Sequence, residues 1–158
     1  MYLRDARADE LPELSELCLR SKAVWGYDLA FIEACRAELT LRPDELETTV
    51  IAVAEDGRGV AGVVQVGVDG GQAELLKLFV DPARIGSGVG RLLFDWAVAA
   101  ARRAGASRLV IESDPGAAEF YRRMGARDAG MAPSGSVPGR MLPRLSCDLR
   151  DGTPPRPT

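Results

Sequence analysis

Residues 81–94, DPARIGSGVGRLLF, hold three glycines within five positions, directly before apolar residues at helical spacing. The segment before them, residues 73–80, is apolar and predicts a strand, and the helical pattern after them ends at Gly105. A glycine weakens a helix interior by about 1 kcal/mol relative to alanine, so backbone freedom concentrated at the helix start needs a reason. The pattern predicts a strand, a glycine turn and a long amphipathic helix in succession.

The glycine turn has the properties of an anion-binding loop. Backbone N–H groups at a helix start lack intrahelical partners and lie at the positive end of the helix dipole, and residues 86–90 would let a phosphate oxygen approach them. Arg84 and Arg91 could add charge at the edges. The stretch has no Gly-Lys-Ser/Thr, and its G-x-G-x-G spacing differs from the dinucleotide pattern G-x-G-x-x-G. A tight turn that only packs helix against sheet is the alternative.

The rest of the chain predicts a single α/β domain. The 158 residues are 46% hydrophobic and 27% charged, and the predicted order is β-α-α-β-β-β-α-β-α-β-β. The first helix is expected to be capped by Asp9, and the second to cover residues 28–39. We expect the domain to occupy residues 1–150 and the proline-rich residues 151–158 to be a disordered tail.

Composition excludes several kinds of chemistry. The chain has no histidine, and its three cysteines (Cys18, Cys35 and Cys147) lack paired spacing, so we expect buried cysteines, no metal site and no Ser-His or Cys-His catalysis. No apolar run approaches the ~20 residues that span a bilayer, and the N-terminus lacks a signal-peptide core. A cytoplasmic protein without a membrane partner is expected.

Charge is distributed unevenly along the chain. Residues 1–60 carry 13 acidic and 7 basic side chains, a net charge of −6, and residues 61–158 carry 10 and 13, a net charge of +3. The basic half contains the glycine turn and suits an anionic ligand, whereas the acidic half suits a cationic one. Neither half has the strong basic patch of a nucleic-acid-binding protein, so no nucleic-acid partner is expected.

From residue 73 to about residue 130 the chain resembles the GNAT superfamily of N-acetyltransferases. The matching parts are the strand AELLKLFVDP, the segment IGSGVGRLLFDWAVAAARRAG, the strand RLVIES and the segment DPGAAEFYRRMGAR. The resemblance implies a mixed, mostly antiparallel sheet of six to seven strands, with helices on both faces and a splay between strands 4 and 5. Two positions depart from the family pattern: Ile85 replaces a Gln or Arg, and Gly116 replaces an Asn that holds the pantetheine arm.

The same resemblance implies acetyl-CoA as cosubstrate, with its pyrophosphate on the glycine turn and its pantetheine arm along the fourth strand. The cofactor-binding residues it implies are Leu78, Phe79, Val80, Ile85, Gly86, Ser87, Gly88, Val89, Gly90, Arg91, Gly116 and Tyr121. The implied activity is direct transfer of an acetyl group to the amine of a small-molecule acceptor in a ternary complex. A homodimer is common in such proteins.

Two residues are the catalytic candidates. Tyr121 matches the tyrosine that protonates the leaving thiolate in many family members, and Glu74 lies where some members have a general-base glutamate. The alternatives are a tyrosine that only packs against the sheet, and a carboxylate that pairs with Lys77 or an arginine. Glu112 and Asp114 are weaker candidates for the base, and water-mediated deprotonation is a further possibility. By resemblance, the backbone N–H of residue 79 is the oxyanion donor.

Two segments outside these motifs, residues 20–28 and 133–140, are expected to bind the acceptor. The candidate side chains are Trp25, Tyr27, Ser134 and Arg140. An aromatic wall suits a cationic or amphipathic ligand, and a guanidinium group suits a carboxylate. The alternative is that the aromatic rings cap the core and that Arg140 pairs with a carboxylate of the protein, such as Asp28.

Two other functions remain open on the sequence alone. A non-catalytic acyl-CoA-binding or sensor domain would explain the departures at Ile85 and Gly116, although the retained Tyr121 and Glu74 argue for turnover. A nucleotide-binding module would use the same glycine turn, and it would be protected by ATP or NAD instead of acetyl-CoA.

Overall fold

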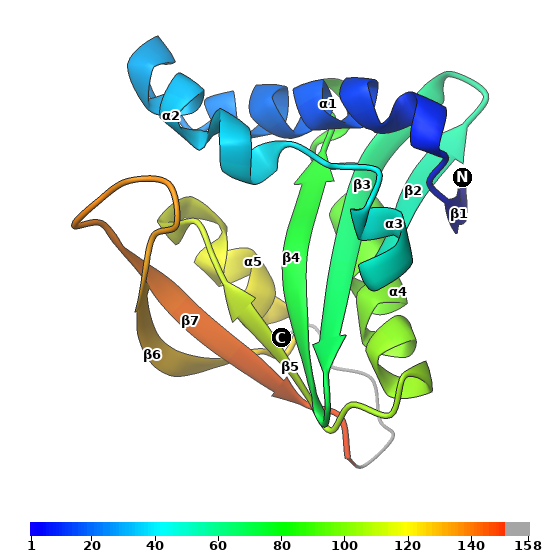
Figure 1. Cartoon of the computed structure of the whole chain (residues 1–158), viewed down its shortest axis with the longest axis vertical. Coiled ribbons are helices and arrows are strands. Elements are labelled where there is room, and N and C mark those ends of the chain that lie inside the picture. Colours follow the sequence, from blue (N-terminus) through cyan, green and yellow to red (C-terminus); the bar gives the residue numbers. More distant parts are fainter. Residues whose placement is uncertain (151–158) are drawn as a thin grey trace.

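A seven-stranded sheet organises the computed structural model, which describes residues 1–150 (Figure 1). The strands are β1 (Tyr2–Asp5), β2 (Val50–Asp56), β3 (Gly59–Asp69), β4 (Gln72–Val80), β5 (Arg108–Glu112), β6 (Arg127–Pro133) and β7 (Met141–Asp148). Their order across the sheet is β1-β2-β3-β4-β5-β7-β6, and every neighbouring pair is antiparallel except β4–β5. The predicted mixed, mostly antiparallel sheet is therefore confirmed, while the predicted tail lies outside the described residues.

Helices cover both faces of this sheet, as predicted. They are α1 (Leu11–Ala23), α2 (Leu29–Leu39), α3 (Glu45–Thr48), α4 (Val89–Arg103) and α5 (Ala118–Arg123), with 3-10 turns η1 (Ala8–Glu10), η2 (Pro82–Arg84) and η3 (Pro115–Ala117). Alternating strand residues face two separate cores. Val64 and Leu93 belong to the core under α4 and α5, and Val63 and Leu14 belong to the core under α1 and α2.

Two local features differ from the sequence prediction. The cap predicted at Asp9 is wrong, because α1 follows the 3-10 turn η1, in which the Glu10 carboxylate accepts a hydrogen bond from Arg7 N at 2.7 Å. The short helix α3 was not expected. Its first turn is closed by the Glu45 carboxylate, which accepts from Arg42 N at 2.8 Å.

Strands β4 and β5 separate after a short parallel pairing. Residues 72–75 of β4 pair with residues 108–111 of β5, and β4 then continues alone on that edge to Val80. β5 instead stays paired with β7, so the two strands diverge toward α2 in a V (Figure 1). The predicted splay between strands 4 and 5 is therefore confirmed.

A β-bulge lies on β4 at the mouth of this opening. Val66 pairs with Leu75 while Gln65 pairs with Lys77, so Leu76 is an extra residue on β4. Glu74 and Lys77 pair with β3 residues two positions apart, and both therefore face the α1–α2 side of the sheet.

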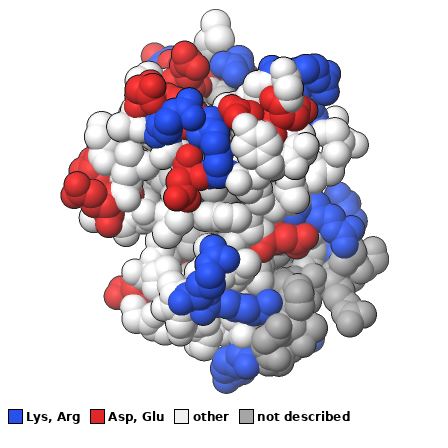
Figure 2. Space-filling view, turned by 90° about the vertical axis from the view of Figure 1, so that its right-hand side faces the viewer, with Lys and Arg blue, Asp and Glu red and all other residues white. Residues whose placement is uncertain are grey.

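The surface carries both signs of charge. Figure 2 shows the side that bears β1, where acidic and basic side chains are mixed over the upper half and basic ones predominate over the lower half.

Among residues 1–150, each helix is too short or too polar to span a bilayer.

Gly62 tests the packing of β3 against α4. A Cβ at this position would lie 2.8 Å from Leu93 Cδ1 and 2.9 Å from the backbone oxygen of Phe79. Gly62→Ala is expected to lower the free energy of unfolding by about 1–3 kcal/mol, because backbone and core side chains must shift. Urea-induced unfolding measures the effect.

The matched control is Gly57→Ala, where a Cβ meets nothing within 4 Å and φ is not positive. This change should leave the free energy of unfolding within about 1 kcal/mol of the parent. Equal effects of the two substitutions would contradict the packing described here.

Candidate active site

The three glycines of the predicted turn serve two different structural roles. Gly86 and Gly88 adopt φ values of +86° and +89°, and a Cβ on either would meet nothing within 4 Å. These two residues shape the loop and leave its backbone accessible. At Gly90 a Cβ would lie 3.3 Å from the ring of Phe120, so this glycine lets α5 pack closely against α4.

The loop presents unused amides at the start of α4. Gly88 is the N-cap, and its carbonyl accepts the first intrahelical bond, from Leu92 N at 3.1 Å. The N–H groups of residues 88–91 therefore have no partner within the helix. With the helix dipole behind them and Arg91 exposed beside them, they form a fitting site for a pyrophosphate.

Arg84 anchors the loop from below. Its side chain is 8% exposed, and the guanidinium donates to both carboxylate oxygens of Asp56 at 2.7 and 2.9 Å. The hydrogen bond from Arg84 lowers the pKa of Asp56 to about 2, and one from Arg58 N adds to this effect. Ile85, the next residue, is 55% exposed. Arg84 is therefore engaged in an ion pair with Asp56, and the positive potential at the loop comes from the backbone amides and Arg91.

The free edge of β4 offers backbone groups next to the loop. Leu78, Phe79 and Val80 pair with residues 62–64 of β3, but β5 pairs with β4 only as far as Leu75. The opposite edge of residues 76–80 therefore faces the opening, where an extended chain such as a pantetheine arm can hydrogen-bond to it.

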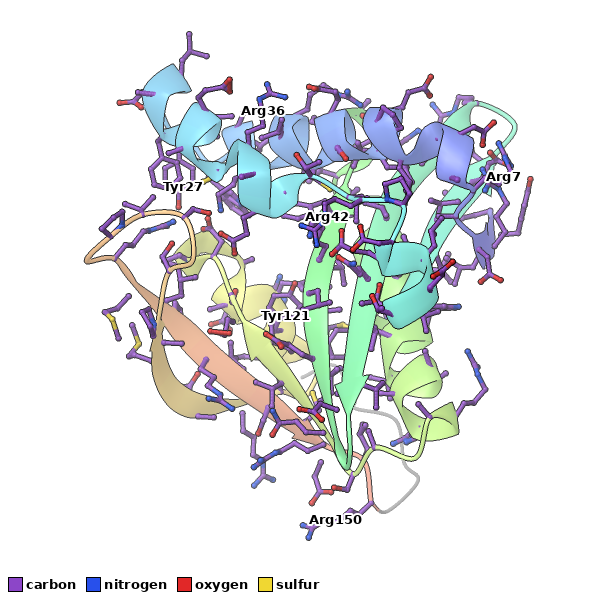
Figure 3. The ribbon with its side chains drawn as sticks, in the orientation of Figure 1. Arg7, Tyr27, Arg36, Arg42, Tyr121 and Arg150 are labelled. Carbon is purple, nitrogen blue, oxygen red and sulfur yellow. The ribbon has the colours of Figure 1, made fainter. Side chains whose placement is uncertain are left out.

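Tyr121 reaches the opening from the α5 side. Its ring centroid lies 5.9 Å from that of Phe94 and 5.1 Å from that of Phe120, and the residue is 6% exposed. In Figure 3 it lies between β4 and β5. Burial raises the pKa of the Tyr121 phenol, and the negative charge of Asp114 raises it further. The hydroxyl therefore keeps its proton throughout the physiological range and is a hydrogen-bond donor.

A cavity of about 270 Å³ lies on the α1–α2 side of the opening. It is lined by Glu38, Glu45, Gln65, Glu74, Leu75, Leu76, Lys77, Glu112, Pro133, Gly135 and Leu142. These residues come from α2, α3, five strands of the sheet (β3 to β7) and the segment that joins β6 to β7. Four of them are glutamates and one is a lysine, so the cavity favours a cation.

Glu74 contributes a half-buried carboxylate to this cavity, next to the β4–β5 opening. Burial raises its pKa, and the neighbouring carboxylate of Glu112 raises it further, against a smaller effect of Arg144. Lys77 does not neutralise it but donates to Gln65 Oε1 at 3.1 Å. Glu74 therefore binds a proton more readily than an ordinary glutamate, which suits a general base.

A buried chain of hydrogen bonds fixes α3 over the cavity. Gln65 is completely buried, and its amide donates to Glu45 at 3.2 Å and to Thr49 at 3.1 Å while its oxygen accepts from Lys77. The sequence analysis did not place these residues in the site. Gln65 and Lys77 each interrupt an apolar strand, and that interruption was a usable signal. Glu38 offered no such signal.

The residues predicted to bind the acceptor lie beside the cavity and not in its lining. Arg140 donates to the Tyr27 hydroxyl at 2.6 Å, and that hydroxyl donates to Asp114 at 2.8 Å. Arg140 thus approaches Asp114, at 3.8 Å, instead of Asp28, which caps α2. Ser134 accepts hydrogen bonds from two backbone amides of its own loop, and its neighbours Pro133 and Gly135 line the cavity.

Trp25 covers the turn that leads into α5. A Cβ at Gly116 would lie 2.9 Å from Cε3 of the Trp25 ring, so no larger residue fits there without a shift. The Gly116 N–H donates to Asp114 at 2.9 Å. The position predicted to contact pantetheine is therefore occupied by a contact within the protein.

Several solved structures that resemble this fold are described as acetyltransferases. The PaiA N-acetyltransferase of Thermoplasma acidophilum, in complex with coenzyme A, superposes with a TM-score of 0.78 at 16% identity, over 94% of this chain and 98% of that chain. The ribosomal-protein-S18-alanine N-acetyltransferase of Escherichia coli gives 0.69 at 17% identity, over 94% and 93%. Nourseothricin acetyltransferase gives 0.59 at 30% identity, over 64% and 65%.

The sequence leads to the same assignment. Residues 47–125, half of the chain, match the family model of the acetyltransferase (GNAT) domain. The chain therefore belongs to the GNAT acetyltransferase family, which confirms the resemblance found over residues 73 to about 130. No curated protein matches the chain in sequence.

Gly88→Glu tests the anion-binding loop. The substitution puts a side chain and a negative charge among the free amides, so we expect acetyl-CoA affinity to fall at least about a hundredfold by calorimetry.

Gly105→Glu is the control at the other end of α4. Gly105 has φ +86°, close to the +89° of Gly88, and equally open surroundings. This variant should bind acetyl-CoA as the parent does. If Gly88→Glu binds as tightly as Gly105→Glu, the loop is not the pyrophosphate site.

Proposed function

We propose that this chain is an N-acetyltransferase that moves the acetyl group of acetyl-CoA directly to the amine of a small-molecule acceptor. The observation that carries the proposal is the β4–β5 opening, which has the glycine loop and Tyr121 on one side and the acidic cavity with Glu74 on the other. Two ligands bound from opposite faces would meet there, as a ternary complex requires.

The chain's own groups fit acetyl-CoA along one path. The amides of residues 88–91 would hold the pyrophosphate, and the free edge of Leu78, Phe79 and Val80 would hold the pantetheine arm. Bound there, acetyl-CoA supplies a thioester whose acetyl group passes to a neutral amine, with the free thiol as second product. Ile85 gives the loop an apolar edge where other family members use a polar side chain.

The chemistry requires three services from the protein. An alkyl ammonium has a pKa of about 10.4, so Glu74 accepts its proton before the nitrogen attacks the thioester carbon. The backbone N–H of Phe79 donates to the oxygen that becomes negative. Tyr121 donates a hydrogen bond to the sulfur as the C–S bond breaks. Because the pKa of Tyr121 is raised, we assign it stabilisation of the thiolate rather than full loss of its proton. The proton that converts the thiolate to the free thiol is the one that the attacking nitrogen loses as the amide forms.

The cavity indicates the kind of amine. Its volume of about 270 Å³ suits a small molecule, and its four glutamates outnumber its single lysine, which gives the lining an excess of negative charge. We therefore assign an acceptor that carries a second positive charge in addition to the reacting amine, such as a short diamine. We therefore base the assignment of an amine-bearing small-molecule acceptor on both the volume and the charge of the cavity.

Two departures from the family pattern favour a second candidate, a non-catalytic acyl-CoA-binding domain. Both Ile85 and Gly116 depart from the family pattern, and Gly116 is covered by Trp25. Such a domain would bind acetyl-CoA but release no thiol with any amine. Protection by ATP or NAD, and not by acetyl-CoA, would instead indicate a nucleotide-binding module.

Tyr121→Phe tests the thiolate assignment. The variant keeps the ring that packs on Phe94 and loses only the hydroxyl. With acetyl-CoA and 1,4-diaminobutane, kcat should fall about a hundredfold while the KM for acetyl-CoA stays within about twofold.

Tyr2→Phe is the control, because the hydroxyl of Tyr2 bonds to Glu55 at the far edge of the sheet. It should keep parental rates. Parental kcat in Tyr121→Phe would show that the Tyr121 hydroxyl does not stabilise the departing thiolate.

Glu112→Gln tests the base through its pH dependence. Since the negative charge of Glu112 raises the pKa of Glu74, the substitution should lower that pKa. The enzyme is inactive with Glu74 protonated, so the acidic limb of kcat/KM should move to lower pH.

The parent and the variants are compared with the same acceptor, so the titration of the acceptor amine contributes equally to every pH profile. The control Glu16→Gln, a half-exposed carboxylate on α1 paired with Arg36, should not move the limb. If the acidic limb of kcat/KM does not move in Glu112→Gln, Glu74 is not the general base.

A further inference from the structure

Asp114 joins three segments at the turn that leads into α5. Its Oδ2 accepts from Lys22 Nζ at 3.2 Å and from the Tyr27 hydroxyl at 2.8 Å, and its Oδ1 accepts from Gly116 N at 2.9 Å. The Asp114 side chain is only 11% exposed. Lys22 belongs to the end of α1 and Tyr27 to the loop between α1 and α2, so both are fastened to the turn η3.

The loop between β6 and β7 is tied to the same point. Arg140, at its end, donates to the Tyr27 hydroxyl at 2.6 Å and lies 3.8 Å from Asp114 Oδ2. Its guanidinium carbon is 4.8 Å from the ring centroid of Phe31, which stacks on Tyr27 at 4.1 Å. In Figure 3, Tyr27 lies between the start of α2 and this loop. We call Lys22, Tyr27, Asp114 and Arg140 the Asp114 clasp.

The segments that the clasp joins also build the acceptor cavity. The helix α2, which starts just after Tyr27, carries Glu38, and the loop that ends at Arg140 carries Gly135. These two walls touch each other as well, through a hydrogen bond from the Ser136 hydroxyl to Glu38. The turn at Asp114 continues directly into the helix of Tyr121.

The clasp is electrostatically balanced. Burial works to raise the pKa of Asp114, but the hydrogen bonds from Gly116 N, Tyr27 and Lys22 outweigh it and lower that pKa. The carboxylate is therefore ionised at neutral pH between the cations Lys22 and Arg140. A partly buried, fully hydrogen-bonded carboxylate of this kind holds its partners in a single arrangement.

We propose that Asp114 is a positioning residue for acetyl transfer: through Lys22, Tyr27 and Arg140 it holds the walls of the acceptor cavity in register with Tyr121. This inference rests on the proposed function. Tyr27 and Arg140 then act on the acceptor indirectly, through the walls that they fasten, and not by touching it.

Tyr27→Phe removes the hydroxyl that joins Asp114 to Arg140 and keeps the ring stacked on Phe31. With acetyl-CoA and 1,4-diaminobutane, the acceptor KM should rise about tenfold, because a hydroxyl bonded to two charged groups is lost, while the KM for acetyl-CoA stays within about twofold. Tyr2→Phe is the matched control and should change neither value.

Hydrogen exchange gives a readout that does not depend on turnover. Since one hydroxyl ties both segments, the amides of residues 24–28 and 134–140 should exchange faster together in Tyr27→Phe. Unchanged exchange, or faster exchange in one segment alone, would overturn the clasp. A parent that releases no thiol with any amine would overturn the proposed function, and exchange alone would then decide the clasp.

Arg140→Lys separates positioning from direct binding. If Arg140 bound an acceptor carboxylate, the substitution would raise the KM for ornithine but not for 1,4-diaminobutane, which lacks that group. The clasp predicts the same fold increase for both acceptors. A selective loss with ornithine would overturn the indirect role.

Discussion

The parallel pairing of β4 with β5 ends at Leu75, and the arrangement of the site depends on this early end. Strand β4 continues for five more residues with one edge unpaired, because β5 stays with β7. Unpaired backbone inside a sheet is costly unless a ligand or water satisfies it, so the opening is suited to a chain that completes the ladder. The bulge at Leu76, opposite the Gln65–Val66 step, turns Glu74 and Lys77 to the same face beside it.

The two faces of the opening carry opposite electrostatic character. Free amides at the start of α4 favour an anion on one side, and four glutamates around a small cavity favour a cation on the other. The uneven charge of the sequence, with a net charge of −6 over residues 1–60 and +3 over residues 61–158, accounts for part of this contrast. Glu38 and Glu45 come from the acidic half and the glycine loop from the basic half, but Glu74 and Glu112 also belong to the basic half and reach the cavity through the fold.

Local patterns predicted the elements that act through their own backbone. The strand before the glycine loop, the loop itself and the helix that carries Tyr121 lie within one continuous stretch, and the chain order of the strands followed from period-two and helical spacing. The cavity could not be predicted in this way, because Glu38, Gln65 and Glu112 are far apart in sequence and meet only in the folded sheet. The partner of Arg140 likewise depended on a tertiary contact, with Asp114 instead of Asp28.

The most direct test compares two amines that share a four-carbon chain and differ in one terminal charge. With acetyl-CoA in excess, release of free thiol is measured with butylamine and with 1,4-diaminobutane, in the parent and in the double variant Glu38→Gln/Glu45→Gln. The account predicts transfer to both amines in the parent, a kcat/KM about tenfold higher for the diamine, and loss of that preference in the variant. No thiol release with either amine, or equal kcat/KM for the two amines in the parent, would contradict it.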